Sequence, residues 1–244
     1  MFASELAIRL ATAALGARSS SAIAIASVIG LASFIGIASP AWSAEVGIAR
    51  YQGKRVLFLR DIAPTKENPR GESMRVADVA KLEALIARER VDEVLFDSGG
   101  GDEPAGLAIG RLIRKQGLAT RIPSGARCAS ACADAFLGGV ARRIEPNGRY
   151  GIHMPTGVND PDLVRKLLDL LNSYKGHAEI REARKLLQFL EKNGAKMAAR
   201  WAAFVVEMGA SQRLVSFGVE TSAAEMTYLT RQQMVDFNVV NVID

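Results

Sequence analysis

The chain has 244 residues, of which 49% are hydrophobic and 23% charged, the composition of a folded protein and not of a disordered one. Its net charge of +5 is spread along helical stretches without a long basic block, which favours a solvated surface over a nucleic-acid groove. Two cysteines and two histidines, without zinc-type spacing, predict neither a metal site nor a cofactor.

An uncharged apolar run at 22–38 sets the N-terminal segment apart from the rest. Arginines precede the run, and the small residues Ala41 and Ser43 follow it at the −3 and −1 positions of a cleavage site, as in a secretory signal. We therefore expect 1–43 to be a cleaved signal peptide and the protein to be exported, to the periplasm. The alternative is an uncleaved inner-membrane anchor at 22–38, which would be the only membrane contact. A buried core helix is less favoured because nothing polar interrupts the run.

Strands and helices alternate in the next part of the chain. Stretches rich in β-branched and aromatic residues predict strands, and stretches with apolar residues at helical spacing predict helices. In chain order the prediction is a strand at 55–62, a helix at 76–91, a strand at 91–98, a helix at 103–117, a strand at 118–123, a helix at 130–139 and a strand–turn–strand segment at 141–154. This alternation predicts crossover units, a largely parallel sheet and an α/β fold.

From Asp160 onward the pattern becomes almost continuously helical. Asp160 is a predicted N-cap, and leucines lie on one face of two successive helices, at 163–174 and 182–194. The Asn-Gly pair at the end of the second stretch predicts that this helix stops there. We treat 158–212 as an all-helical insertion within one domain that spans 44–244.

A third helix is expected at 195–211, and the chain closes with a short capped helix. An apolar stripe at three- to four-residue steps marks the third helix, for which core packing is favoured over a ligand site or an oligomer contact. The stripe consists of Met197, Trp201, Val205 and Met208. Thr230 and Gln233 form a predicted capping box, and Asn238 ends that short helix before a terminal strand.

Two loops of the α/β region carry residues suited to catalysis. Three successive glycines at 99–101 let main-chain N–H groups approach a phosphate or a developing oxyanion, although a tight turn would use the same residues. Ser130 opens a predicted helix, where the positive end of the helix favours an alkoxide, although an ordinary N-cap is the alternative. His153 ends a predicted strand 23 residues later, where it could act as general base or be merely structural.

Taken in this order, the loops resemble the ClpP/crotonase superfamily, and more narrowly the ClpP-like serine proteases with their secreted bacterial relatives of the periplasmic protein-like type. The resemblance covers about 46–156 and again about 200–244. Four motifs carry it, each weak alone and more specific as an ordered set. They are Ser-Gly-Gly-Gly at 98–101, Cys-Ala-Ser-Ala-Cys at 128–132, Ile-His-Met-Pro at 152–155 and the segment YLTRQQMVDFNVV at 228–240.

The resemblance implies a ββα spiral and a serine hydrolase that acts on a peptide or protein substrate. It assigns Ser130 as nucleophile and His153 as base, with an oxyanion hole from the N–H groups of Gly101 and Ala131. It also implies a homo-oligomer, since the helical insertion falls where ClpP-type proteins carry a handle helix used in assembly.

The third catalytic residue does not carry over from the family. Met226 stands where the family has its aspartate, so the adjacent Glu225 is the candidate acid and Glu220 a second one. Without an acid the histidine tautomer would be poorly fixed. A catalytically inactive binding or assembly module is therefore one alternative function, and a crotonase-type acyl-CoA enzyme that uses only the glycine loop is another.

The two cysteines flank Ser130, at Cys128 and Cys132. In an exported protein both thiols would meet an oxidising environment, and four residues across a helix start is a separation that a disulfide can span. Such a bridge would brace the turn that carries the serine. Two buried free thiols are the equally weighted alternative.

Overall fold

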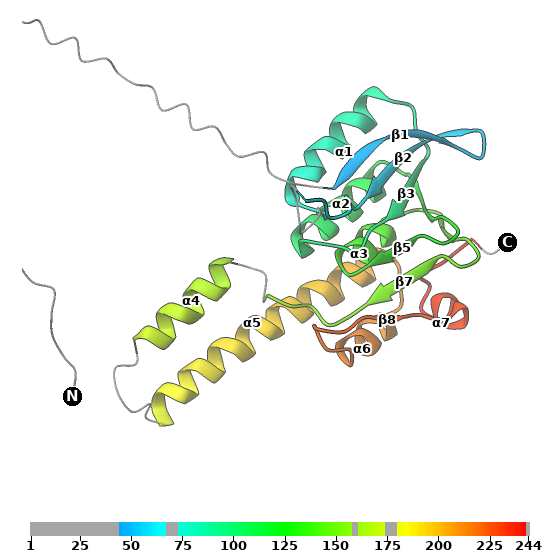
Figure 1. Ribbon diagram of the computed structural model, residues 1–244. Helices are drawn as coiled ribbons and strands as arrows, with labels where there is room; N and C mark the ends of the chain where they lie inside the picture. Colours follow the sequence, from blue (N-terminus) through cyan, green and yellow to red (C-terminus); the bar gives the residue numbers. More distant parts are fainter. Residues whose placement is uncertain (1–43, 67–72, 158–160, 174–179, 243–244) are drawn as a thin grey trace, which may run out of the picture. The chain divides into compact units, whose positions relative to one another are not determined.

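The computed structural model describes four stretches of the chain (Figure 1), namely 44–66, 73–157, 161–173 and 180–242. The segment predicted as signal or anchor, 1–43, lies outside the described residues, as does the predicted N-cap Asp160. Within the four described stretches no helix is both long and apolar enough to cross a membrane.

The chain folds into a mixed α/β domain in which each element predicted between residues 55 and 154 is present. The strands are β1 (Glu45–Tyr51), β2 (Lys54–Arg60), β3 (Glu93–Asp97), β4 (Ala119–Ile122), β5 (Arg127–Ala129), β6 (Arg142–Ile144), β7 (Arg149–Ile152) and β8 (Thr227–Tyr228). The helices are α1 (Val76–Arg88), α2 (Glu103–Lys115), α3 (Ala131–Leu137), α4 (Pro161–Asn172), α5 (Ile180–Glu207), α6 (Arg213–Val219) and α7 (Arg231–Asp236).

The strands form two sheets, and most pairs in them are parallel. The larger sheet has the order β1-β2-β3-β4-β6 and is parallel except for the β1–β2 hairpin. The smaller has the order β5-β7-β8, with β5 and β7 parallel. The segment predicted as strand–turn–strand therefore divides, because β6 joins one sheet and β7 the other. The largely parallel α/β arrangement predicted from the sequence is confirmed.

Helices α2 and α3 pack closely against each other beside the larger sheet. Seven residues of α2 and all seven residues of α3 are buried, so the two helices form the centre of the core. Gly106 makes a close approach possible: a Cβ atom there would lie 2.2 Å from the carbonyl oxygen of Ala131. Only glycine allows this spacing, and the contact fixes the first turn of α3 against α2.

The predicted stop at Asn193 and Gly194 is wrong, because α5 is one continuous helix through both residues. The Asn193 side chain donates a 2.6 Å hydrogen bond to the carbonyl oxygen of Phe189, one turn earlier, and so bonds within the helix instead of ending it. Core packing of the predicted stripe is confirmed for the three members at its C-terminal end. They are Trp201, Val205 and Met208, at most 4% exposed.

The C-terminal tail runs beside β6 without forming the predicted terminal strand. The capping box of Thr230 and Gln233 is present as predicted, but residues 239–242, the part of the tail that the structure describes, form no ladder. The reason lies in Arg142, which is 2% exposed and donates from its guanidinium to the carbonyl oxygens of Asn238 (2.7 Å) and Val239 (2.9 Å). Those carbonyls are thereby withdrawn from strand pairing.

Arg142 also joins the ends of other elements. Its Nη1 donates to the carbonyl oxygens of Gly139, at 3.1 Å, and Met208, at 3.2 Å. These carbonyls follow α3 and α5, so a single side chain ties two helix ends to the tail. Burial lowers the pKa of Arg142 to about 10, and the carbonyl oxygens around it supply the partners that its guanidinium lost from water.

Candidate active site

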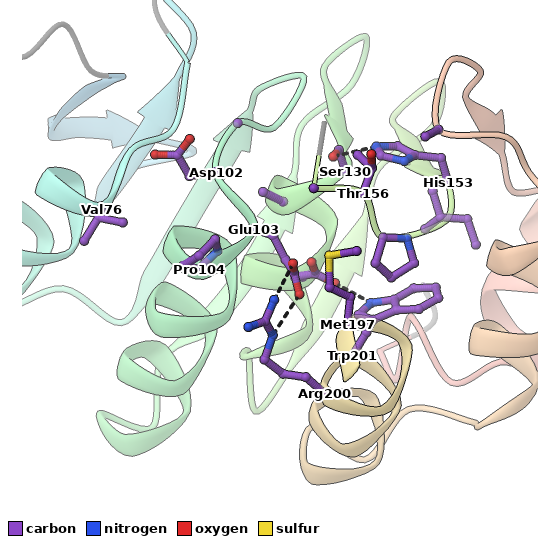
Figure 2. Close-up of a pocket in the computed structure, with 17 residues that line it drawn as sticks. Val76, Asp102, Glu103, Pro104, Ser130, His153, Thr156, Met197, Arg200 and Trp201 are labelled. Atoms are coloured by element: carbon purple, nitrogen blue, oxygen red, sulfur yellow. Dashed lines mark hydrogen bonds and ion pairs between the residues drawn. The ribbon is translucent and has the colours of Figure 1, made fainter. Parts of the chain in front are cut away.

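Ser130 stands between β5 and α3 in an uncommon backbone conformation. Its φ of 54° and ψ of −129° are rare for a residue with a side chain. Strained backbone conformations of this kind cluster at functional sites. The residue occupies the N-cap position of α3, yet its hydroxyl makes no capping hydrogen bond. Instead Oγ lies 2.8 Å from Nε2 of His153 (Figure 2), so the N-cap interpretation of this serine does not describe its hydrogen bonding.

The residues around Ser130 hold it firmly. Its N–H donates to the carbonyl oxygen of Gly151 in β7, at 3.0 Å. The structure joins Cys128 and Cys132 in a disulfide with a Cα–Cα distance of 5.1 Å, so a covalent bridge links β5 to the first turn of α3 across the serine. Both of the residue's chain neighbours are small and only 2% exposed.

The glycine loop comes into direct contact with this turn. A Cβ atom on Gly100, whose φ is +114°, would lie 2.7 Å from the Cβ of Ser130, so the loop and the serine touch only because glycine stands there. Asp61 accepts hydrogen bonds from the Ser98 hydroxyl (2.6 Å) and from the N–H of Gly99 (2.7 Å). The Ser98 hydroxyl in turn accepts from the N–H of Gly100, at 3.0 Å.

This arrangement leaves two main-chain donors beside Ser130. The N–H groups of Gly101 and Ala131, which the resemblance implied as an oxyanion hole, donate to no acceptor among the residues that the structure describes. The N–H of Ala131 is in the first turn of α3, where no intrahelical partner exists. Gly101 and Ala131 both line the cavity that Ser130 lines, and their role as an oxyanion hole stays a prediction.

His153 follows the last residue of β7 and is partly exposed. Its Nδ1 lies 2.7 Å from the carbonyl oxygen of Met154, which can only accept a hydrogen bond. This bond therefore assigns the proton to Nδ1 and leaves the lone pair of Nε2 facing the hydroxyl of Ser130. That is the tautomer in which a histidine can accept a proton from serine.

The structure does not bring the candidate acids to the histidine. Glu220 and Glu225 are both exposed, and within the described stretches no carboxylate is hydrogen-bonded to His153. Glu225 lies in a turn in which its N–H donates to the carbonyl oxygen of Ser222, and the structure shows no hydrogen bond between its side chain and the imidazole. A main-chain carbonyl thus occupies the place at Nδ1 that an acid holds in a triad.

A cavity of about 450 Å³ adjoins the Ser130–His153 pair. Its walls come from the glycine loop, the start of α2, the first turns of α3, the end of β7 and the middle of α5. Figure 2 shows Met197, Arg200 and Trp201 of α5 reaching into it. About half of the wall surface is apolar, and the larger apolar side chains in it are those of Val76, Pro104, Ile152, Pro155, Met197 and Trp201.

Asp134 is a residue of this cavity that the sequence analysis did not single out. It lies one helical turn after Ser130, is 8% exposed and accepts a 2.8 Å hydrogen bond from the indole N–H of Trp201. Burial raises the pKa of Asp134 to about 7, the Trp201 hydrogen bond opposes the rise, and the nearby Glu103 adds to it. The only signal in the sequence was an acid inside the otherwise apolar helix ACADAFL.

Nothing in the described part of the chain resembles a metal site. No group of three or more histidine, cysteine, aspartate or glutamate side chains is clustered there. What the geometry does bring together is a serine and a histidine, beside a cavity that Gly101 and Ala131 also line. A serine paired with a histidine is an arrangement that can carry out nucleophilic attack on an acyl group.

Comparison with known proteins gives similarity at the level of structure only. No family model and no curated protein matches the chain. Among solved structures it is similar to ClpP1 from Listeria monocytogenes, at 20% identity and a TM-score of 0.45, over 75% of this chain and 88% of that one. A mutant of the same ClpP1 gives 22% identity and a TM-score of 0.41, over 68% and 81% of the two chains. Similarity at this level does not extend to activity.

Proposed function

We propose that the chain is a serine hydrolase, a peptidase of ClpP-like type, in which Ser130 is the nucleophile and His153 the general base. The observation that carries the proposal is the 2.8 Å contact between Ser130 Oγ and His153 Nε2, made by a serine that stands at an N-cap position without capping the helix. The order of the motifs along the chain and the ββα pattern of the two sheets support the ClpP-like assignment.

In the proposed reaction Ser130 Oγ bonds to the acyl carbon of the substrate while its proton passes to Nε2 of His153. The carbonyl oxygen becomes an oxyanion, which the N–H groups of Gly101 and Ala131 stabilise; each such donor is typically worth about 10²- to 10³-fold in rate. Nε2 then gives its proton to the leaving amine. Water attacks the acyl-serine with the same histidine as base, which releases the acid and restores the hydroxyl.

The proposed site uses a dyad with a carbonyl partner. The Met154 carbonyl oxygen, 2.7 Å from Nδ1, orients the imidazole and selects its tautomer, which is one of the two roles of a triad acid. It lacks the negative charge that would stabilise the imidazolium, the other role. We therefore expect a slower enzyme than one with a complete triad, but an active one.

Two further proposals concern where the protein works and in what form. The Cys128–Cys132 disulfide supports export, since such bridges persist in oxidising compartments. Large apolar side chains exposed on α4 and the first half of α5 support a homo-oligomer; they are Val164, Leu168, Leu171, Leu187 and Leu190. A reporter fused after residue 244 would test export, and a solution mass equal to one chain would contradict the oligomer.

A fluorophosphonate probe applied to the purified full chain tests the proposed function. The probe bonds to an activated serine with loss of fluoride, so intact mass before and after labelling, with peptide mapping, identifies the residue. Wild type is expected to be labelled at Ser130, and the Ser130→Ala and His153→Ala variants are expected to resist labelling. Ser124→Ala, at an exposed loop serine, is the matched control and should label like wild type.

Two outcomes would contradict the proposal. No labelling of folded wild type would leave the inactive binding or assembly module as the better description. Labelling that survives Ser130→Ala would show that a different serine is activated. A crotonase-type acyl-CoA enzyme is the weaker alternative, because it would give the strained Ser130 and its contact with His153 no role.

A further inference from the structure

The cavity beside Ser130 contains three carboxyl groups, and two of them have ionic partners. Asp102 pairs with Arg75 at 3.1 Å, and Glu103 forms a two-bond pair with Arg200, at 2.8 and 3.2 Å (Figure 2). The positive charge of Arg200 is therefore neutralised by Glu103. Neither of these two acids therefore needs a ligand to supply a positively charged partner.

Asp134, the third carboxyl group, forms no ion pair with any residue in the described stretches. Among the described residues, its one hydrogen-bond partner is the indole N–H of Trp201, which donates to Oδ1. A carboxylate offers about four lone-pair sites, so most of the acceptor capacity of this side chain is unused. A side chain that is 8% exposed and lines a cavity can find its remaining partner only in what enters that cavity.

The surroundings define the shape of such a partner. Asp134 is four residues from Ser130 along the chain, which is about 6 Å along a helix and about the length of a four-carbon stem. The apolar side chains among the lining residues, such as Ile152 and Met197, suit methylene groups.

We propose that this cavity receives a long cationic substrate side chain, of the lysine or arginine type, and that Asp134 determines this specificity. The inference rests on the proposed hydrolase function and names its substrate class. An acidic substrate side chain would be repelled by the negative charge of Asp134. An apolar side chain of equal length would leave the second carboxyl oxygen of Asp134 without a hydrogen-bond partner. A cation within contact distance also draws the carboxyl group into its ionised form.

Two diphenyl phosphonate probes that differ in one group test the inference on the full chain. One carries a lysine-type side chain next to the reactive phosphorus, and the other a norleucine-type chain of equal length without the ammonium. Each bonds its phosphorus to a serine Oγ with release of phenoxide, and intact mass gives the labelling rate. In wild type the lysine-type probe is expected to react about tenfold faster or more.

Asp134→Asn is the decisive variant. Asparagine keeps an oxygen for the Trp201 indole but carries no charge, so the lysine preference should fall to near unity while the norleucine-type probe still reacts. Asp236→Asn, at an exposed acid on α7, removes the same charge elsewhere and should keep the preference. A preference that persists in folded Asp134→Asn would overturn the role of Asp134.

A pH series on wild type keeps the test valid if Asp134→Asn does not fold. The ratio of the two labelling rates cancels every effect of pH on the catalytic steps that both reactions share. The charged groups around Asp134 are Glu103 on α2, with its partner Arg200 on α5, and Tyr150 on β7, whose own pKa is raised by burial. The lysine preference is expected to rise between about pH 5.5 and about pH 8, and a flat ratio would contradict the inference.

The fluorophosphonate experiment separates the two failures. If fluorophosphonate labels Ser130 but the lysine-type probe has no advantage, the hydrolase stands and the specificity is wrong. If fluorophosphonate labels nothing in the folded chain, the hydrolase and the specificity that rests on it are both overturned.

Discussion

The two partners of the candidate site are held in different ways. Ser130 is fixed by a disulfide, by a glycine loop in van der Waals contact and by a main-chain hydrogen bond to β7. His153 follows the end of a strand in a partly exposed segment, and among the described residues the carbonyl of Met154 is its only hydrogen-bond partner besides the serine. The nucleophile is thus held by contacts with the core, whereas the base is held by the hydrogen bond to the carbonyl oxygen of the next residue.

Because of this difference, we expect substitutions on the two sides of the site to affect stability and activity differently. Changes on the serine side should disturb both, because the same contacts pack α2, α3 and β5 together. Changes on the histidine side should affect activity and leave the free energy of unfolding nearly unchanged. The four predictions below test this separation, from the largest expected effect to the smallest.

Gly100→Ala should have the largest effect. The new methyl group would lie 2.7 Å from the Cβ of Ser130, and φ is +114°, so the loop must move away from the serine. We expect fluorophosphonate labelling to slow by about 100-fold and the free energy of unfolding to fall by about 2 kcal/mol. Gly125→Ala is the matched control, since its φ is also positive, at +78°, but no atom lies within 4 Å. Equal loss of labelling in both variants would contradict the contact argument.

Removing the disulfide should come next. The double variant Cys128→Ala/Cys132→Ala should lower the free energy of unfolding, measured in urea, by about 2 kcal/mol. Labelling of Ser130 should also slow, because the turn that carries it loses its brace. Wild type reduced under native conditions serves as the control for the substitutions themselves. Unchanged stability together with unchanged labelling would show that the disulfide does not hold Ser130 in position.

Asp134 predicts a dependence of stability on pH. Because burial raises its pKa from 3.8 to about 7, the folded chain keeps a proton that the unfolded chain releases above about pH 4. The free energy of unfolding should therefore fall as the pH rises from about 4 to about 7, and level off above about pH 7. Asp134→Asn should lack this component in urea titrations, whereas Asp236→Asn should retain it. Parallel pH profiles for wild type and Asp134→Asn would refute the buried neutral acid.

Met154→Ala should have the smallest effect. The contact with His153 comes from the main-chain carbonyl, and the Met154 side chain is 39% exposed. We expect labelling within about twofold of wild type and a change in the free energy of unfolding within about 0.5 kcal/mol. A large loss of labelling would show that the side chain itself, and not the carbonyl, positions the base.

Much of the fold could be anticipated from the sequence because alternating strand and helix patterns are local signals. The approach of Ser130 to His153 could be anticipated from the order of the motifs, and their catalytic roles stay predictions. Strand β5 was missed because three residues are too few to show an alternating pattern. The continuous α5 was missed because an Asn-Gly pair signals a stop only when the asparagine does not bond within the helix.

The cavity could not be anticipated, because it depends on contacts distant in sequence. Asp134 and Trp201 are 67 residues apart, and only the packing of α5 against α3 brings them together. In the sequence Trp201 belonged to an apolar stripe, and its indole N–H gave no pattern. The Met154 carbonyl was equally hidden, since main-chain atoms carry no sequence signal.

The position of Arg142 has a consequence for the order in which the chain folds. Its guanidinium donates to the carbonyl oxygens of Asn238 and Val239, which lie 96 and 97 residues later in the chain, as well as to those of Gly139 and Met208. A contact between residues so far apart in sequence forms only after a long loop has closed, which slows folding. The region around β6 therefore completes its hydrogen bonds only once the segment at 238–239 has docked.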